Sequence, residues 1–356
     1  MQLKVISFFI LLFTAVITRA QTQKVKNDTA FYELYPGKLV ITPYLEKNVS
    51  GFSFTNPASS QKIKFHTNAP VGIGLRLDYN WFSFSGSYGV GIIDPNFNKA
   101  KGKTQSLNIK TTIASKFILA DIYFQQTKGF YLQPQKKSAN TVLEPFYTRP
   151  DIRNRLIGFS GMYVLNGKKF TVRPAFKFDA RQKKAAGSFV TGIEFFTGYL
   201  KGDSSLIPSF YSATHSNTEI KRINYTFFGP GVGYGHSFVL QKYFFITALG
   251  ALNADIGHLK EFNNDKTFTE KGWRFNPNLN FRGGLGYNKP SWEIAFSCFT
   301  KRIFLANQQQ ANRYQLHNNI YKLSFTKRIN AGKNIPKTVN WAGSIIDKMG
   351  FGFLID

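Results

Sequence analysis

The stretch VGIGLRLDYN (residues 71–80), followed by WFSFSGSYGVGI (residues 81–92), alternates apolar residues with small or polar ones in both halves. Successive residues of a strand point to opposite faces, so this period predicts a hairpin with one apolar and one polar face. Each arm has about ten residues, the length that a tilted strand needs to cross the hydrocarbon of a bilayer. Strands of soluble sandwiches are usually shorter. The stretch therefore favours a transmembrane barrel, provided that the rest of the chain repeats it.

The same alternation returns along most of the chain. Further runs occupy 39–44, 107–113, 118–124, 156–164, 189–200, 223–238, 244–252, 275–287, 292–298 and 321–325. A hairpin is predicted at Asn166-Gly167, because this pair separates the run at 156–164 from another at 170–178. At Gly229-Pro230-Gly231 the apolar phase shifts by one residue, which predicts a β-bulge.

Short connections near Asn80, Ser115, Asn166, Leu240 and Asn288 mostly alternate with long polar ones. Outer-membrane barrels have short periplasmic turns and long outer loops. We therefore predict one all-β, antiparallel transmembrane barrel of roughly 12–14 strands. The runs add up to about thirteen crossings, whereas a barrel with both ends in the periplasm needs an even number. The odd count points to a hidden or false crossing near 201–222.

The N-terminus has the parts of a secretory signal. Lys4 precedes an apolar run over 5–17, and Thr18-Arg19-Ala20 resembles a cleavage site. The alternative, an uncleaved anchor helix, is disfavoured because the run is short. The expected organisation is a signal peptide at 1–20, a lead-in at 21–37, the barrel at 38–329 and a tail at 330–356. The tail is either a short amphipathic segment or a periplasmic plug. The expected location is the outer membrane of a Gram-negative bacterium, reached after signal cleavage.

The chain is strongly basic, with 46 Lys+Arg against 19 Asp+Glu and a net charge of +27. Such a surface prefers anionic partners. The charges are scattered and form no nucleic-acid module, so outer-membrane lipids are the expected partner, nucleic acid is not, and protein partners stay open. The one cysteine, Cys298, excludes an intrachain disulfide framework and is expected on an apolar strand face.

Motifs for chemistry are sparse. Gly102-Lys103-Thr104 ends like a phosphate-binding loop but lacks its upstream glycine, because Phe97 stands there. The five histidines show no metal-ligand spacing, so no metal or cofactor is expected. His236 and Ser237 are the one conceivable fragment of a lipid-modifying site, but a polar rim pair is the strongly favoured interpretation, because a dipeptide hardly constrains the geometry of a site.

The most suggestive set is charged and predicted to face the lumen. It consists of Arg76, Asp78, Lys110, Arg173, Lys177, Asp179, Arg274, Arg282, Lys322 and Arg328. These side chains predict either a basic channel that favours anions or a lumen filled by paired charges. A second basic set, in loops, is predicted either to contact lipid phosphates or to be solvated. It consists of Lys136, Lys137, Lys183 and Lys184.

Several ordered blocks resemble an uncharacterised, outer-membrane-barrel-like family of Bacteroidota with a domain of unknown function. They are 28–32 (DTAFY), 102–104 (GKT), 147–152 (YTRPDI), 182–189 (QKKAAGSF), 201–208 (KGDSSLIP) and 228–234 (FGPGVGY). The resemblance covers about 28–329 and implies a barrel fold. It carries no activity and no catalytic residue, and the tail from Asn330 is least covered.

The sequence therefore predicts a non-enzymatic outer-membrane barrel: a pore or transporter with a basic lumen, or a surface structural protein. One alternative is a lipid-modifying enzyme in the barrel wall. The other is a secreted soluble β-protein that binds acidic glycans.

Overall fold

The computed structural model describes residues 28–58, 60–89, 99–133, 146–215, 219–263, 266–268, 273–305, 313–332 and 334–348. Its strands are β1 (Tyr32–Leu34), β2 (Lys38–Asn48), β3 (Gly51–Thr55), β4 (Lys62–His66), β5 (Gly72–Tyr79), β6 (Phe82–Gly89), β7 (Gln105–Ala114), β8 (Ile118–Leu132), β9 (Thr148–Val164), β10 (Ala180–Gln182), β11 (Ala186–Lys201), β12 (Arg222–Leu240), β13 (Phe244–Asn263), β14 (Lys266–Phe268), β15 (Arg274–Asn288), β16 (Trp292–Leu305) and β17 (Arg313–Asn330). Its helices include α2 (Arg173–Phe176) and α3 (Asn334–Lys348). The predicted signal peptide lies outside the described residues.

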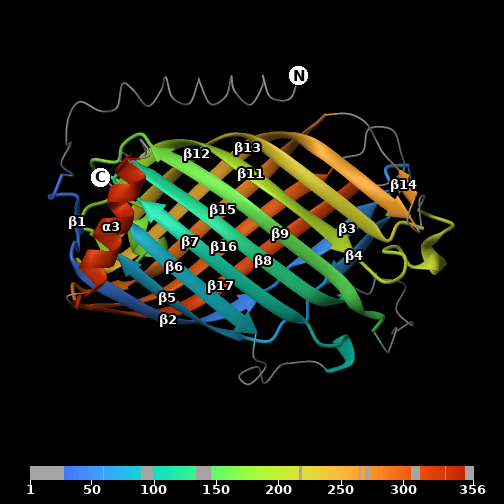
Figure 1. Cartoon of the computed structure of the whole chain (residues 1–356), viewed down its shortest axis with the longest axis horizontal. Coiled ribbons are helices and arrows are strands. Elements are labelled where there is room, and N and C mark those ends of the chain that lie inside the picture. The colour runs from blue at the N-terminus through green and yellow to red at the C-terminus, as the bar shows by residue number, and fades with distance from the viewer. Residues whose placement is uncertain are drawn as a thin grey trace.

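Within the described residues, twelve strands close into an antiparallel barrel, as the alternation predicts. They follow one another around the ring in chain order, from β2 through β5 to β9 and then β11, β12, β13, β15 and β16, and β17 returns to pair with β2. The tilted strands run between two ends (Figure 1). The short turns and α3 lie at one end, which we call the inner end, and the long connections lie at the other, the outer end. Among the described residues, no helix is long and apolar enough to span a membrane.

The predicted hairpin has the expected two faces over its described strands, 72–79 and 82–89. β5 and β6 pair across a turn at Asn80-Trp81. The side chains of Ile73, Leu75 and Phe84 face outward and are nearly half exposed, whereas Arg76 is buried on the inner face. An outward apolar row of this kind fits contact with lipid, because an exposed apolar surface this large would be unfavourable in water.

The segment 165–185 corrects the prediction of a strand at 170–178. It connects β9 to β11 at the inner end, contains α2 instead of a crossing, and then forms β10, which pairs with β1. Pro174 sits in the first turn of α2, where its missing N–H is tolerated, whereas in a central strand it would remove a ladder hydrogen bond. This false crossing, and not the segment 201–222, explains the odd strand count. We call 165–185 the plug.

The outer end has a second closure. β3 continues along β17 where β2 ends, β4 returns beside β3, and β4 pairs with the outer end of β8. The β3–β4 hairpin thus bridges β17 and β8 and bypasses β5, β6 and β7. Inside this narrower ring lies a core of buried apolar side chains, which we call the outer core. Its members include Phe52, Phe54, Phe65, Phe130, Phe196, Phe227 and Leu259.

The outer core also explains the phase shift in β12, where a bulge was predicted. No residue is inserted, since Gly229, Pro230 and Gly231 pair in unbroken register with Glu194, Ile193 and Gly192 of β11. Before this point Phe227 faces the outer core, and after it Val232 faces outward with 65% of its surface exposed. The strand keeps its regular alternation of faces. From the outer end toward the inner end, the interior changes from apolar to polar, and the apolar residues of β12 therefore change from the inward to the outward face.

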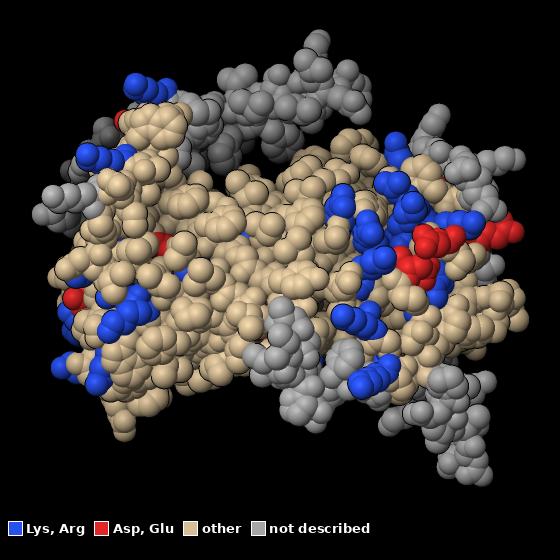
Figure 2. Space-filling view, turned by 60° about the horizontal axis from the view of Figure 1, so that its bottom comes forward, with Lys and Arg blue, Asp and Glu red and all other residues tan. Residues whose placement is uncertain are grey.

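The outer surface has a matching banded pattern. Figure 2 shows a broad band of uncharged residues, with Lys and Arg gathered toward the outer end, where Asp and Glu lie among them, and a smaller charged group at the inner end. A lipid-facing band between two charged zones is the surface that a bilayer requires.

Candidate functional site

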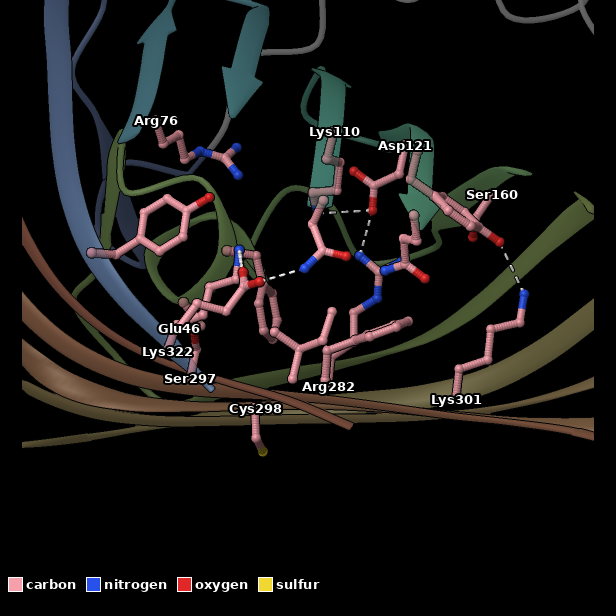
Figure 3. A pocket seen from close by; sticks show the side chains of 18 of the residues that line it. Glu46, Arg76, Lys110, Asp121, Ser160, Arg282, Ser297, Cys298, Lys301 and Lys322 are labelled. Atoms are coloured by element: carbon pink, nitrogen blue, oxygen red, sulfur yellow. Dashed lines mark hydrogen bonds and ion pairs between the residues drawn. The ribbon is translucent and has the colours of Figure 1, made fainter. Parts of the chain in front are cut away.

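A cavity of about 120 Å³ lies inside the barrel, between the plug and the outer core. Phe176 and Phe178 of the plug line its inner side, and its walls come from strands on all sides of the ring (Figure 3). Five cationic side chains and three carboxylates line it. They are Arg76, Lys110, Arg282, Lys301 and Lys322, and Glu46, Asp121 and Glu194. The cavity is therefore polar and carries an excess of positive charge.

Asp121 of β8 is the centre of one charge cluster. Its Oδ2 accepts from Arg282 Nη1 at 2.7 Å and lies 3.3 Å from Lys110 Nζ, and its Oδ1 accepts from Thr112 Oγ1 at 2.6 Å. Arg282 comes from β15, across the barrel from β8 in the ring order. A carboxylate shared by two cations compensates buried charge that would otherwise be strongly unfavourable. The cluster thus ties opposite walls together.

Lys301 of β16 is the centre of a second cluster. Its Nζ donates to Glu194 Oε2 at 3.0 Å and to Tyr123 Oη at 3.1 Å. Asn280 Nδ2 also donates to Glu194 Oε2, at 3.1 Å. Glu194 belongs to β11 and Tyr123 to β8, so this cluster again joins separate walls.

Two further ion pairs lie on neighbouring strands. Lys322 Nζ lies 2.9 Å from Glu46 Oε2 between β17 and β2. Arg328 Nη2 donates to Glu293 Oε2 at 2.5 Å, and both side chains are almost fully buried. Arg328 Nε also donates to the carbonyl of Phe178 at 2.8 Å, so this pair holds the plug as well.

The plug is anchored by its own charges. Asp179 accepts from both Arg173 and Lys177, and Lys177 also donates to the carbonyl of Asn80 in the β5–β6 turn. Phe178 adopts a positive φ of 65°, an uncommon conformation for a bulky residue. Such a conformation persists only when its surroundings hold it, which indicates a fixed plug.

Of the ten predicted lumen residues, nine lie inside the barrel or in the plug, as their strand phase or their burial shows. Arg76 pairs with Asp78 at 2.9 Å, and the other seven, Arg328 among them, pair as described above. Arg274 begins β15, but its side chain lies outside the described residues. The prediction placed Arg173, Lys177 and Asp179 on a strand, whereas they belong to the plug. Among the described residues the structure adds Lys301 and six buried acids to the set, namely Glu46, Asp121, Glu194, Asp255, Glu261 and Glu293. Their inward strand phase was the available signal.

The structure separates the two residues of the esterase-like fragment. Ser237 is buried on the inner face of β12 and shares a hydrogen bond of 2.7 Å with Thr247. His236 faces outward, 3.2 Å from the hydroxyl of Tyr234. Neighbouring strand residues point to opposite faces, so these two cannot act as nucleophile and base.

The remaining motifs also have structural positions. Thr104 of the Gly102-Lys103-Thr104 fragment donates to the carbonyl of Gly129 at 2.7 Å and supports a bulge in β8. Cys298 lies on an outward phase of β16, and Figure 3 shows its side chain pointing away from the cavity. Among the described residues, no His, Cys, Asp and Glu side chains group as metal ligands.

Two of the four predicted loop lysines, Lys183 and Lys184, lie within the described residues. Lys183 Nζ donates to the carbonyl of Thr29 at 2.7 Å, and the Lys184 ammonium lies 5.7 Å from the ring centre of Phe31. Both therefore tie the plug to the N-terminal lead-in at the inner end. Lys136 and Lys137 lie outside the described residues.

Comparison with known proteins finds one matching family and solved barrel structures of low sequence identity. The model of a domain of unknown function (DUF4421) matches residues 26–327. Solved structures with similar architecture include the outer membrane protease OmpT from Escherichia coli, at 8% identity, a TM-score of 0.39, and coverage of 83% of this chain and 98% of that one. The translocator domain of the autotransporter NalP from Neisseria meningitidis has 9% identity, a TM-score of 0.38, and coverage of 82% and 88%. The toluene transporter TodX from P. putida has 6% identity, a TM-score of 0.29, and coverage of 83% and 91%. No curated protein matches the sequence.

Proposed function

The chain belongs to the DUF4421 family, and we propose that it is a non-enzymatic outer-membrane barrel that is sealed to solutes and serves as a structural surface protein. The observation that carries this proposal is the pair of closures around the cavity. The plug fills the inner end and the outer core fills the outer end. A pore needs a continuous polar path, and a packed apolar core interrupts one.

The interior ion pairs support a structural role. Asp121, Glu194 and Glu293 each pair with a cation from another strand, so the charges compensate one another instead of lining an open channel. We also propose that the barrel has no catalytic activity, because the side chains of His236 and Ser237 point apart.

Conductance across a planar lipid bilayer tests this proposal. The folded, purified barrel should insert without stepwise conductance in 1 M KCl at up to about 100 mV. Heat-modifiable migration on a gel is the control for folding. Regular conductance steps from a folded sample would contradict a sealed barrel.

The excess of cations around the cavity favours a second candidate, a transporter that holds a small anion in an occluded state. Buried polar atoms without a protein partner, including Arg76 Nη2 and Arg282 Nε, could contact such a solute. This candidate requires conductance, or anion uptake into liposomes, that disappears in an Arg282→Met variant.

A further inference from the structure

Outward-facing cations form a straight row near the outer end of the barrel. Lys128 on β8 lies opposite Arg153 on β9, Arg153 lies opposite Lys201 on β11, and Lys201 lies opposite Arg222 on β12. We call these four residues the basic row. Neighbouring strands are about 4.8 Å apart, so four like charges follow one another over roughly 15 Å.

No described carboxylate neutralises this row, and the side-chain hydrogen bond from Arg222 Nε goes to the uncharged Asn224 at 2.7 Å. None of its four side chains lies within ion-pair distance of a described carboxylate. Like charges directly opposite one another destabilise a sheet. This contrasts with the barrel interior, where Asp121, Glu194 and Glu293 each have a cationic partner. Four cations that strand pairing holds side by side, with no carboxylate within ion-pair distance, favour an external anion.

The height of the row on the barrel wall identifies the kind of anion. The same strands and the neighbouring β13 carry a cross-strand row of apolar residues closer to the middle of the barrel, in which Ile122, Phe195 and Ile256 are 41–52% exposed. The row at Lys128 is six residues along β8 from Ile122, and the intervening outward positions are Phe124 and Gln126. At 3.3 Å per residue and a tilt near 45°, the row lies roughly 9 Å above Phe124. The polar head-group layer is about 5–8 Å thick on each side of the hydrocarbon, so the row lies at its outer edge.

The next set of cross-strand neighbours, on the inner side of the basic row, also suits the head-group layer. It contains Arg155, whose guanidinium lies 5.3 Å from the ring centre of Tyr199, and Lys260. Arg222 lies 4.9 Å from the centre of the same ring. Aromatic residues with a polar tip favour the membrane interface, and here two guanidinium groups contact the ring of Tyr199. Planar guanidinium groups bind phosphate with two parallel hydrogen bonds.

We propose that the basic row, with Arg155 and Lys260 below it, is a binding site for the phosphate groups of phosphorylated lipids in the outer leaflet. This site does not depend on whether the lumen conducts, so it stands or falls separately from the proposed function. Its occupant is a lipid rather than free phosphate, because the cations lie directly above lipid-facing side chains and acyl chains would add apolar contact.

Lipid binding by the purified, folded barrel in non-ionic detergent tests the proposal. The probes are diphosphorylated lipid A, the same lipid without phosphates, and inorganic phosphate. The site variant is Lys128→Gln/Arg153→Gln/Lys201→Gln/Arg222→Gln. The control variant, Lys168→Gln/Lys242→Gln/Lys289→Gln/Lys327→Gln, removes the same charge from the inner end. We expect the diphosphorylated lipid to bind the wild type and the control about equally, and the site variant at least about 10-fold more weakly.

A measurement of unfolding temperature separates binding from a purely structural role. Without lipid, the site variant should unfold at the same or a higher temperature than the wild type, because the like charges are gone. With the diphosphorylated lipid, only the wild type and the control should be stabilised. Equal binding of the dephosphorylated lipid, an equal effect of inorganic phosphate, equal binding by the site variant, or an equal loss in the control would each overturn the proposal.

Discussion

At the residue scale, two of the blocks that carry the family resemblance meet at one point of the outer end. Arg149 Nε and Nη2 donate to the two carboxylate oxygens of Asp151, each at 2.8 Å, and Arg149 Nη1 donates to the carbonyl of Ser205 at 2.6 Å. The backbone N–H of Asp203 donates to Asp151 Oδ2 at 2.9 Å. A Cβ on Gly202 would approach Arg149 Nη2 to 2.8 Å, which explains the glycine. The two blocks therefore fasten the connection after β11 to the start of β9.

This clamp predicts a dependence on pH. Burial by itself would raise the pKa of the Asp151 carboxyl, but hydrogen bonds from Arg149 and from the Asp203 N–H lower it from 3.8 to about 2. A carboxyl whose folded pKa is lowered contributes stability above its unfolded pKa, and this contribution disappears as the pH falls from about 4 to about 2. Because the group is partly solvated, we expect roughly 1 kcal/mol at pH 7. Asp151→Asn should lose that amount at pH 7 and little at pH 2, measured as the unfolding temperature.

The matched control is Asp203→Asn, since the Asp203 side chain is exposed and the clamp uses only its backbone. An equal loss in both variants, or a loss in Asp151→Asn that is the same at pH 2 and pH 7, would rule out the clamp.

At the element scale, β12 shows that hydrophobic phase reports the environment of each face rather than the pleat alone. Its inward residue Phe227 is buried in the outer core, whereas its outward residues Val232 and Tyr234 face lipid. β11 behaves in the same way, with Phe196 inward and Phe189 outward. The level at which the inward residues change from polar to apolar marks the inner boundary of the outer core.

The outward face of β12 changes from apolar to polar along the strand, which predicts that an introduced charge is tolerated at one outward position and not at another. Val232→Arg should destabilise the barrel by about 2–4 kcal/mol, because it places a charge in the hydrocarbon. Asn224→Arg should cost at most about 1 kcal/mol, since Asn224 lies outside the hydrocarbon and the change only removes its hydrogen bond from Arg222 and adds a like charge beside Arg222 and Lys260. Urea unfolding in lipid vesicles measures both. Equal losses of unfolding free energy in the two variants would show that Val232 and Asn224 do not lie on different sides of the hydrocarbon boundary.

The plug and the interior acids show what sequence patterns can and cannot supply here. The alternation from Phe170 to Phe178 imitates a strand, and Pro174 was the one sign against it. The twelve crossings and their inward faces were predictable, because lipid imposes period two on every strand. The pairing of Asp121 with Arg282 was not, because it depends on which strands face one another across the closed ring.

At the scale of the whole molecule, the two closures differ in kind. The plug is a separate segment across the lumen, held by side-chain hydrogen bonds and ion pairs, such as those of Asp179 and Arg328, and by buried apolar residues that include Phe170 and Phe178. The outer core is built into the wall, since the β3–β4 hairpin is part of the sheet and Phe52, Phe54 and Phe65 are fully buried. Each buried side chain of this size contributes about 1.5–3 kcal/mol, so the outer core sums to tens of kcal/mol. Removing the plug should therefore leave the outer closure intact.

This difference predicts the outcome of opening each end. A barrel in which residues 168–184 are replaced by a short Gly-Ser linker should fold with lower stability and still show no conductance steps, because the outer core closes the lumen. Adding Phe52→Ser and Phe65→Ser to that deletion should introduce conductance, since polar side chains admit water into the outer ring. The two serine substitutions in the intact chain are the control and should remain silent. Conductance from the plug deletion alone would show that the outer core does not seal the barrel, and the plug would then be its gate.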